Sequence, residues 1–199
     1  MRGRPKKLNR KEVIEIAMYS YWEEGTQNIS LNEVCRRAGI SKPGLYREFG
    51  NEDGLMKEVL KQYQLKVLDP LHDYLVTSLT VQEITQKLVS TIKDGVDRPL
   101  GCLFVKMREV QPSLGEQTMQ ELVNCHKKTL SAYRKWALKL IKSKNISSDF
   151  SSQLVSKYID VQINNASALL SRGERFQEIE AILVLSFSAL LDLGINVER

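Results

Sequence analysis

Apolar residues recur with the period of an α-helix along almost the whole chain. Between residues 10 and 24 they occupy positions 13, 14, 17, 18, 21 and 22, which fall on one face of a helix. Comparable stripes predict further helices, and we find no convincing strand. The predicted helices cover residues 10–24, 31–38, 41–49, 51–68, 102–110, 113–142, 150–172 and 176–193, and another begins near residue 80. The pattern therefore predicts an all-α fold.

Polar residues at the ends of these stripes predict where the helices start and stop. Three stretches match the capping box, in which a hydroxyl and a carboxylate satisfy free backbone N–H groups: SLNE at 30–33, TVQE at 80–83 and SLGE at 113–116. Glycines follow the first three helices, where they favour termination. Asp69-Pro70 is expected to break or bend the chain after the helix that begins at residue 51. Loops are expected at 97–101 and 145–149.

The second and third helices predict a helix-turn-helix. The turn between them is Gly39-Ile40-Ser41, and Pro43 falls in the first turn of the third helix, where its missing N–H costs little. Leu45 and Phe49, four residues apart, are expected to point inward. The outward positions are then Lys42, Pro43, Gly44, Tyr46 and Arg47, a flat cationic and aromatic surface suited to the DNA major groove. The alternative interpretation is a purely structural helical hairpin.

Charge is concentrated at the start of the chain. Six of the first eleven residues are Lys or Arg, whereas the remainder holds 23 basic and 24 acidic residues, a net charge of −1. A basic arm on a nearly neutral body favours docking to a polyanion, either nucleic acid or an acidic membrane surface. A solvated tail without a function is the alternative.

Composition and motifs exclude several other classes of protein. The three cysteines, an odd number without paired spacing, argue against a disulfide framework and for a reducing compartment. The longest apolar run, residues 181–191, is too short to span a bilayer, and acidic residues interrupt any signal peptide, so we expect a cytoplasmic protein without a membrane partner. No phosphate loop, GxSxG, HExxH or paired CxxC is present. We therefore expect no enzyme activity, no catalytic residues, no cofactor and no metal site.

One stretch of the helix-turn-helix also resembles a known family. The sequence AGISKPGLYREF matches the spacing AGIS-x-x-x-LY-x-x-F, and residues 8–56 as a whole resemble the DNA-binding domain of TetR-family transcriptional regulators. The resemblance implies an N-terminal three-helix domain followed by a C-terminal helical bundle that binds an effector and dimerises. The corresponding divisions are residues 1–50, a connecting helix at 51–69, and residues 70–199. The family often has Lys where this chain has Glu52, which would repel a phosphate.

The resemblance implies a repressor that a small molecule releases from double-stranded operator DNA. An activator or a ligand-independent regulator is the alternative, and a membrane-surface or partner-binding helical protein is a more remote one. RGRP at residues 2–5 resembles an AT-hook core, so Arg2 and Arg4 are expected in the minor groove and Lys6 and Lys7 on phosphates. The predicted DNA-binding residues are Arg2, Arg4, Lys6, Lys7, Ser30, Ser41, Lys42, Pro43, Gly44, Tyr46 and Arg47.

The final helix is apolar almost all round, which predicts that it is buried on two sides. One side can pack within the chain and the other against a second copy, so a homodimer through the last two helices is expected. A twofold dimer would place two reading heads about 34 Å apart, on a near-palindromic operator. A central core helix of a monomer is the alternative. The predicted interface residues are Tyr158, Ile159, Ile163, Ala166, Leu170, Ile182, Leu185, Phe187, Ala189 and Leu190.

An effector site is expected where polar or aromatic residues interrupt inward faces of the C-terminal helices. The candidates are Cys102, Phe104, Met107, His126, Tyr133, Trp136, Gln162 and Asn165, each of which can also be an ordinary core or surface residue. The stretch PLGCLFVK resembles a segment of some family members whose cysteine senses electrophiles. Cys102 is therefore either a redox switch or an inert buried cysteine.

Overall fold

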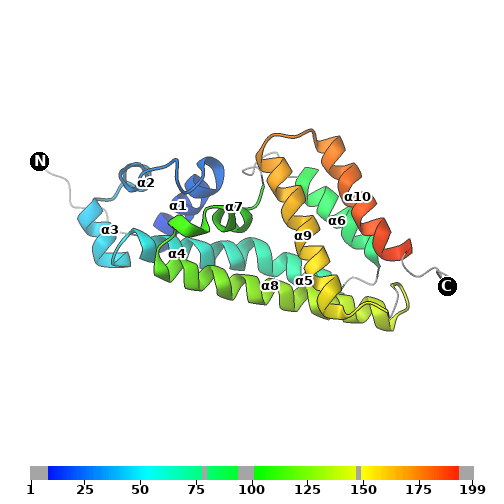
Figure 1. The fold of residues 1–199 in the computed structure, drawn as a ribbon. Helices are drawn as coiled ribbons and strands as arrows, with labels where there is room; N and C mark the ends of the chain where they lie inside the picture. Colours follow the sequence, from blue (N-terminus) through cyan, green and yellow to red (C-terminus); the bar gives the residue numbers. More distant parts are fainter. Residues whose placement is uncertain (1–8, 78–79, 94–100, 147–148, 193–199) are drawn as a thin grey trace, which may run out of the picture.

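The computed structural model describes residues 9–77, 80–93, 101–146 and 149–192, and within these ranges the ordered elements are helices without a strand. The all-α prediction is confirmed (Figure 1). The helices are α1 (Arg10–Glu24), α2 (Leu31–Ala38), α3 (Lys42–Phe49), α4 (Glu52–Tyr63), α5 (Asp69–Thr77), α6 (Val81–Lys93), α7 (Leu103–Glu109), α8 (Glu116–Lys142), α9 (Ser152–Ser171) and α10 (Phe176–Asp192). No helix in these ranges is both long and apolar enough to cross a membrane.

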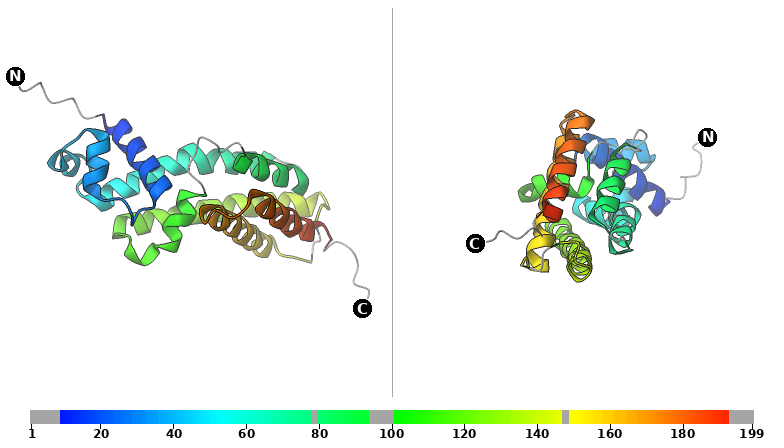
Figure 2. Two further views of the ribbon diagram at one scale, coloured as in Figure 1. Left: turned by 90° about the horizontal axis from the view of Figure 1, so that it is seen from above. Right: turned by 90° about the vertical axis from the view of Figure 1, so that its right-hand side faces the viewer.

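The first three helices form the N-terminal head, which lies at one end of an elongated molecule (Figures 1 and 2). Their apolar stripes meet the first turns of α4, and α7 and the start of α8 complete the same core. Fully buried side chains at its centre include Tyr21, Leu45 and Leu55. The head therefore shares its core with the connecting helix and with part of the C-terminal body.

α4 continues into α5 through a single π-helical turn, Gln64–Leu68. The chain does not break at Asp69-Pro70, because it stays helical from Glu52 to Thr77. The Asp69 N–H bonds to the Gln64 carbonyl five residues earlier, so the register has already widened where Pro70 lacks an N–H.

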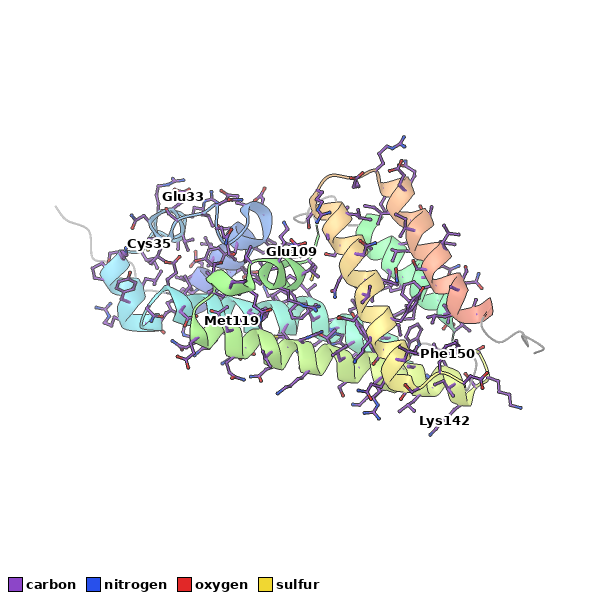
Figure 3. All side chains as sticks on the ribbon, viewed as in Figure 1. Glu33, Cys35, Glu109, Met119, Lys142 and Phe150 are labelled. Atoms are coloured by element: carbon purple, nitrogen blue, oxygen red, sulfur yellow. The ribbon has the colours of Figure 1, made fainter. Side chains whose placement is uncertain are left out.

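The C-terminal body is built around α8, which runs beside and parallel to the α4–α5 rod (Figure 1). α9 packs along α8, and α10 packs on α9 and α6. Their inward faces form a second core around Trp136, Leu75 and Phe187. Figure 3 labels Met119 near the head end of α8 and Lys142 at its far end, so this one helix joins both cores.

Of the three predicted capping boxes, one is complete, one is half-formed and one is wrong. Ser30 Oγ accepts from the Glu33 N–H at 3.2 Å, but the Glu33 carboxylate bonds to Arg36 and Arg37 instead of the Ser30 N–H. Thr80 and Glu83 bond reciprocally, at 3.1 Å and 3.2 Å, and start α6. Ser113 instead ends a short 3₁₀ turn, Gln111–Ser113, and Gly115 is the N-cap of α8 with no side chain to offer.

Parts of the sequence predictions lie outside the described residues. These are the arm at residues 1–8, most of the loop expected at 97–101, part of the loop expected at 145–149, and the end of the last predicted helix.

Candidate nucleic-acid interface

The turn between α2 and α3 depends on one glycine. Gly39 adopts the left-handed conformation, with φ 63° and ψ 32°, which a residue with a side chain rarely adopts. The next N–H, that of Ile40, bonds back to the Cys35 carbonyl at 3.0 Å and closes α2. Ser41 Oγ then accepts from the Gly44 N–H at 3.2 Å and starts α3. These local bonds fix the angle between the two helices.

α3 is held in place by its two inward residues. Leu45 is completely buried and Phe49 is 8% exposed, as their spacing of four predicts. The following turn is equally tight, since a Cβ on Gly54 would lie 2.0 Å from the Phe49 carbonyl oxygen. The end of α3 is therefore fixed against the start of α4.

The opposite side of α3 is a ridge of exposed residues: Lys42, Pro43, Tyr46 and Arg47, with Gly44 half-buried between them. Lys42 Nζ lies 5.7 Å from the centre of the Tyr46 ring, a cation–π distance that brings the two side chains together at the N-terminal half of the helix. The structure therefore brings these five predicted residues together. Ser30 and Ser41 are exposed nearby, but their hydroxyls already act as helix caps.

The other arginines of the head are neutralised by acids. Arg36 and Arg37 both bond to Glu33, and Arg37 also pairs with Glu24. Hydrogen bonds from these two guanidinium groups lower the pKa of Glu33 to about 2. On α2 and α3, as far as the structure describes them, Lys42 and Arg47 are the cations left without an acidic partner.

Arg10 is a structural residue, although it belongs to the basic run at the start of the chain. Its guanidinium bonds to Glu58 at 2.8 Å and pairs with Glu48 at 3.2 Å, and it lies over the Phe49 ring. Arg10 thereby joins α1 to α3 and α4. The basic run at the start of the chain therefore has one free positive charge fewer for binding a polyanion than its sequence suggests.

A hydrogen-bonded contact between the head end of α4 and the body is made by Asp53, in the first turn of α4. Its carboxylate accepts hydrogen bonds from the N–H groups of Gln117 and Thr118, each at 2.9 Å, and from Thr118 Oγ1 at 2.6 Å. These are free N–H groups of the first turn of α8, so Asp53 does the work that the sequence assigned to Ser113 and Glu116. No local pattern indicated this contact, because its partners are 64 and 65 residues away along the chain.

The structure separates the predicted effector residues into different environments. Phe104 and Met107 are buried in the core of the head, whereas Tyr133 and Trp136 are buried in the core of the body. Gln162 accepts from Ser186 Oγ at 2.9 Å and joins α9 to α10. Asn165 is exposed and lines a groove of about 400 Å³ between α7 and α9. A single cavity that contains all eight residues is therefore not seen in the described part of the chain.

His126 belongs to a polar cluster between the two cores. Asp160, whose side chain is 9% exposed, bonds to His126 Nε2 at 3.1 Å and to Arg108 at 3.3 Å. The Phe104 ring lies beside both the His126 ring and the Arg108 guanidinium. Arg108 and Asp160 were not predicted from the sequence, although an acid directly after the inward Ile159 was a usable signal.

Cys102 lies at the start of α7, where its sulfur accepts a hydrogen bond from Tyr63 Oη at 3.2 Å. Burial raises the pKa of this thiol above its ordinary value, more than the hydrogen bonds lower it. A protonated thiol is a poor nucleophile. Within the described ranges no group of three His, Cys, Asp or Glu side chains is placed to hold a metal ion.

The residues predicted for a dimer interface also divide into two sets. Ile159, Ala166, Phe187 and Leu190 are buried in the core of their own chain, so they offer no free surface, which corrects their assignment to an outward face. A helix that is apolar all round does not reveal which side its own chain covers. Leu185 is 71% exposed, Ala189 is also exposed, and Tyr158, Ile163, Leu170 and Ile182 are half-buried. Val161, at 59%, and Val184, at 45%, add exposed apolar surface that was not predicted.

Comparison of the sequence with known families finds one match in the head. Residues 13–59 match the family described as bacterial regulatory proteins, tetR family. The HTH-type transcriptional repressor ComR of Escherichia coli (strain K12) is 39% identical over 62 residues, which are 31% of this chain and 30% of that protein. The HTH-type transcriptional repressor BdcR of the same organism is 32% identical over 96 residues, 48% of this chain and 47% of that protein. The chain thus matches less than half the length of these relatives.

Solved structures match over most of the chain. The regulatory protein TetR from Rhodobacter sphaeroides superimposes with a TM-score of 0.78 at 13% identity, covering 92% of this chain and 98% of that one. A cysteine mutant of the TetR-family regulator CifR, complexed with 26-base-pair operator DNA, gives 0.76 at 19% identity and covers 94% and 100%. At these identities the likeness concerns the fold.

Proposed function

Because the chain belongs to the tetR family of bacterial regulatory proteins, we propose that it is a transcriptional regulator that binds operator DNA as a dimer and that a small molecule releases. The observation that carries this proposal is the exposed ridge of α3, from Lys42 to Arg47, on a helix anchored by Leu45 and Phe49. Such a helix can enter the major groove without rearrangement of the head.

Within the groove the ridge residues take different roles. Arg47, an exposed cation without an acidic partner in the described residues, forks onto guanine O6 and N7. Tyr46 directs its hydroxyl to a phosphate, and Lys42 adds charge beside it. Gly44, without a side chain, lets the backbone approach the bases. Ser30 and Ser41, at the N-termini of α2 and α3, complete the phosphate contacts.

The arm extends this contact along the duplex. Arg2 and Arg4 occupy the minor groove beside the site that α3 reads, and Lys6 and Lys7 neutralise phosphates. Arg10 and the α2 arginines are engaged with acids, so they contribute less to DNA affinity than the sequence total suggests.

Dimerisation uses α9 and α10, where apolar side chains are exposed. Leu185 and Val161 are 71% and 59% exposed, and burying such side chains against a second copy is favourable by about 25 cal/mol per Å². A twofold axis then presents two α3 helices to a near-palindromic operator.

Release by an effector requires that the body and the head move together. α8 supports this coupling, since it contributes Tyr133 and Trp136 to the core of the body and its first turn is bonded to Asp53 of α4, the helix that follows the head. A molecule that binds between α7, α8 and α9 acts by favouring one spacing of the two heads. An activator, or a regulator without a ligand, would use the same head.

The test is selection of bound duplexes from a random pool with the purified protein. We expect a near-palindrome with half-sites one DNA turn apart, and Arg47→Ala should relax one position in each half-site at a cost of about 1–3 kcal/mol. Lys127→Ala, an exposed lysine on α8, is the matched control and should select the same sequence. Enrichment of no sequence, or an unchanged motif in a folded Arg47→Ala variant, would overturn the proposal.

A further inference from the structure

The buried histidine His72 lies beneath a cleft between α5 and α8. His72 is 5% exposed, and within the described residues neither of its ring nitrogens has a hydrogen-bond partner. Its nearest acid is Asp69, with 3.9 Å between Nδ1 and Oδ1, too long for a hydrogen bond. A buried polar group left unpaired is unfavourable, so such groups normally have a partner.

The cleft beside this ring has a volume of about 220 Å³. Its lining consists of Asp69, His72, Asp73 and Val76 from α5, and Lys128, Ser131, Ala132 and Lys135 from α8. It has room for several waters or one small organic molecule. The ring therefore has an accessible space in which a partner can bind.

Two of the four charged groups in the lining are already engaged. Asp69 Oδ2 accepts from Lys128 Nζ at 2.7 Å, and its other oxygen accepts from Gln64 Nε2 at 3.1 Å. Asp73 and Lys135 are exposed, on opposite walls, and have no ion pair among the described residues. The cleft thus offers one free negative charge and one free positive charge on two different helices.

The protonation state of the imidazole sets a further requirement on the molecule that binds in the cleft, beside the two free charges. Burial lowers the pKa of His72, so the ring is neutral at pH 7 and offers one N–H donor and one acceptor nitrogen. Ser131, on the α8 side of the lining, supplies a hydroxyl. The matching molecule is small, carries both signs of charge, and has an oxygen that can accept from the ring.

From this arrangement we infer that the cleft between α5 and α8 binds a zwitterion of amino-acid size, with its carboxylate toward Lys135 and His72 and its ammonium group toward Asp73. An anion alone leaves Asp73 unpaired, and a cation alone leaves Lys135 unpaired. The molecule bridges the two helices immediately after the π turn Gln64–Leu68, a type of irregularity that is frequent at functional sites. This inference concerns the protein free of DNA. It can fail while the proposed regulator function holds, and the proposed function can fail while the inference holds.

The experiment is a titration of the full chain with each of the common α-amino acids, followed by the imidazole ¹⁵N and ¹³C resonances. The protein has only two histidines, and His72 is identified by its proximity to the Tyr133 ring, whose centre is 6.0 Å away. We expect at least one amino acid to shift the His72 signals saturably, with a dissociation constant on the order of 1 mM or lower. Acetate and methylammonium, each with half of the charge pattern, should bind at least about tenfold more weakly.

Two exposed substitutions test the geometry without touching the core. Lys135→Gln should weaken the amino acid at least about tenfold, and Asp73→Asn should remove the preference for the amino acid over its deaminated carboxylate. Lys127→Gln, on the same helix but outside the cleft, is the control and should change binding less than twofold. Absence of a saturable His72 shift with every amino acid, or equal binding by wild type and Lys135→Gln, would overturn the inference and leave ordered water as the partner of the ring.

Discussion

The Asp53 carboxylate caps α8 through Thr118, which supplies both a backbone N–H and a hydroxyl, at 2.9 Å and 2.6 Å. The two residues belong to different helices, Asp53 to α4, which follows the ridge of α3, and Thr118 to the first turn of α8. Gly115 makes the approach possible, because a Cβ there would lie 2.3 Å from Asp53 Cγ. One hydrogen-bonded cap therefore sets how the head sits on the body.

Replacing Asp53 with Asn should reduce stability in a pH-dependent manner. Partial burial tends to raise the pKa of Asp53, but the hydrogen bonds from Thr118 and Gln117 outweigh it and hold the pKa below its ordinary value. The charged cap thus stabilises the folded state fully above the unfolded pKa, near 3.9, and this contribution is lost as the pH falls through the folded pKa. Chemical denaturation should give a difference of about 1–2 kcal/mol at pH 7, shrinking toward pH 3. A difference that is independent of pH would contradict the role of the charge.

Gly115→Ala should destabilise the protein although alanine favours helices. The added methyl group meets the Asp53 carboxylate, so either the cap or the head must shift, at a cost of about 1–3 kcal/mol. Thermal unfolding of the variant, alone and combined with Thr118→Val, measures whether the two changes disturb the same contact. Coupled sites give a double mutant less destabilised than the sum, whereas simple additivity would show that Gly115 acts elsewhere.

Leu185→Asp should convert the proposed dimer to a monomer. The side chain is 71% exposed in the single chain, so a charge there does not disturb its own core but is unfavourable in an apolar interface. Sedimentation velocity is the measurement. Leu138→Asp, an exposed leucine on α8 with 42% exposure, is the control and should remain dimeric. A dimer that persists in Leu185→Asp would place the interface away from this part of α10.

Deleting residues 1–7 should reduce the salt dependence of operator binding. Affinity falls with salt, and each phosphate that is no longer neutralised makes the slope of log affinity against log salt less negative by about 0.9. Removal of Lys6 and Lys7 therefore predicts a slope that is less steep by about 1.8. Fluorescence anisotropy at several salt concentrations gives the slope. Duplexes with A/T or G/C flanks separate two roles of the arm: loss of an A/T preference supports Arg2 and Arg4 in the minor groove, and an unchanged preference supports a non-specific charged tail.

Cys102 should react slowly with alkylating reagents in the folded protein. Burial raises the pKa of its thiol, so the nucleophilic thiolate is scarce at pH 7. Mass spectrometry after a timed iodoacetamide pulse should show Cys102 largely unmodified in the native chain and modified after denaturation. Rapid modification of the native protein would instead favour the electrophile-sensing interpretation. Burial raises the pKa of Cys125 to about 12, so this buried thiol should also stay unmodified and serves as a comparison for Cys102 in the same sample.

The helix-turn-helix was predictable because its determinants are local. The caps Ser30 and Ser41 act on backbone groups three residues away, Gly39 sets its own conformation, and Leu45 and Phe49 are one helical turn apart. The same reasoning failed at Ser113 and Glu116, which have the right spacing for a capping box but are displaced by a 3₁₀ turn. A local pattern shows that a helix start needs a cap, but does not show which residue supplies it.

The sequence by itself determined the helical composition of the chain and the ridge of α3, since both depend on periodicity and on bonds between near neighbours. Only the tertiary structure decided that Asp53 caps α8 and that Phe187 faces inward while Leu185 faces outward. It also decided that His72 lies beneath a cleft without a hydrogen-bond partner among the described residues. These features join residues from different helices, or choose between equally apolar sides of one helix. They depend on how the helices pack, which no spacing along the chain specifies.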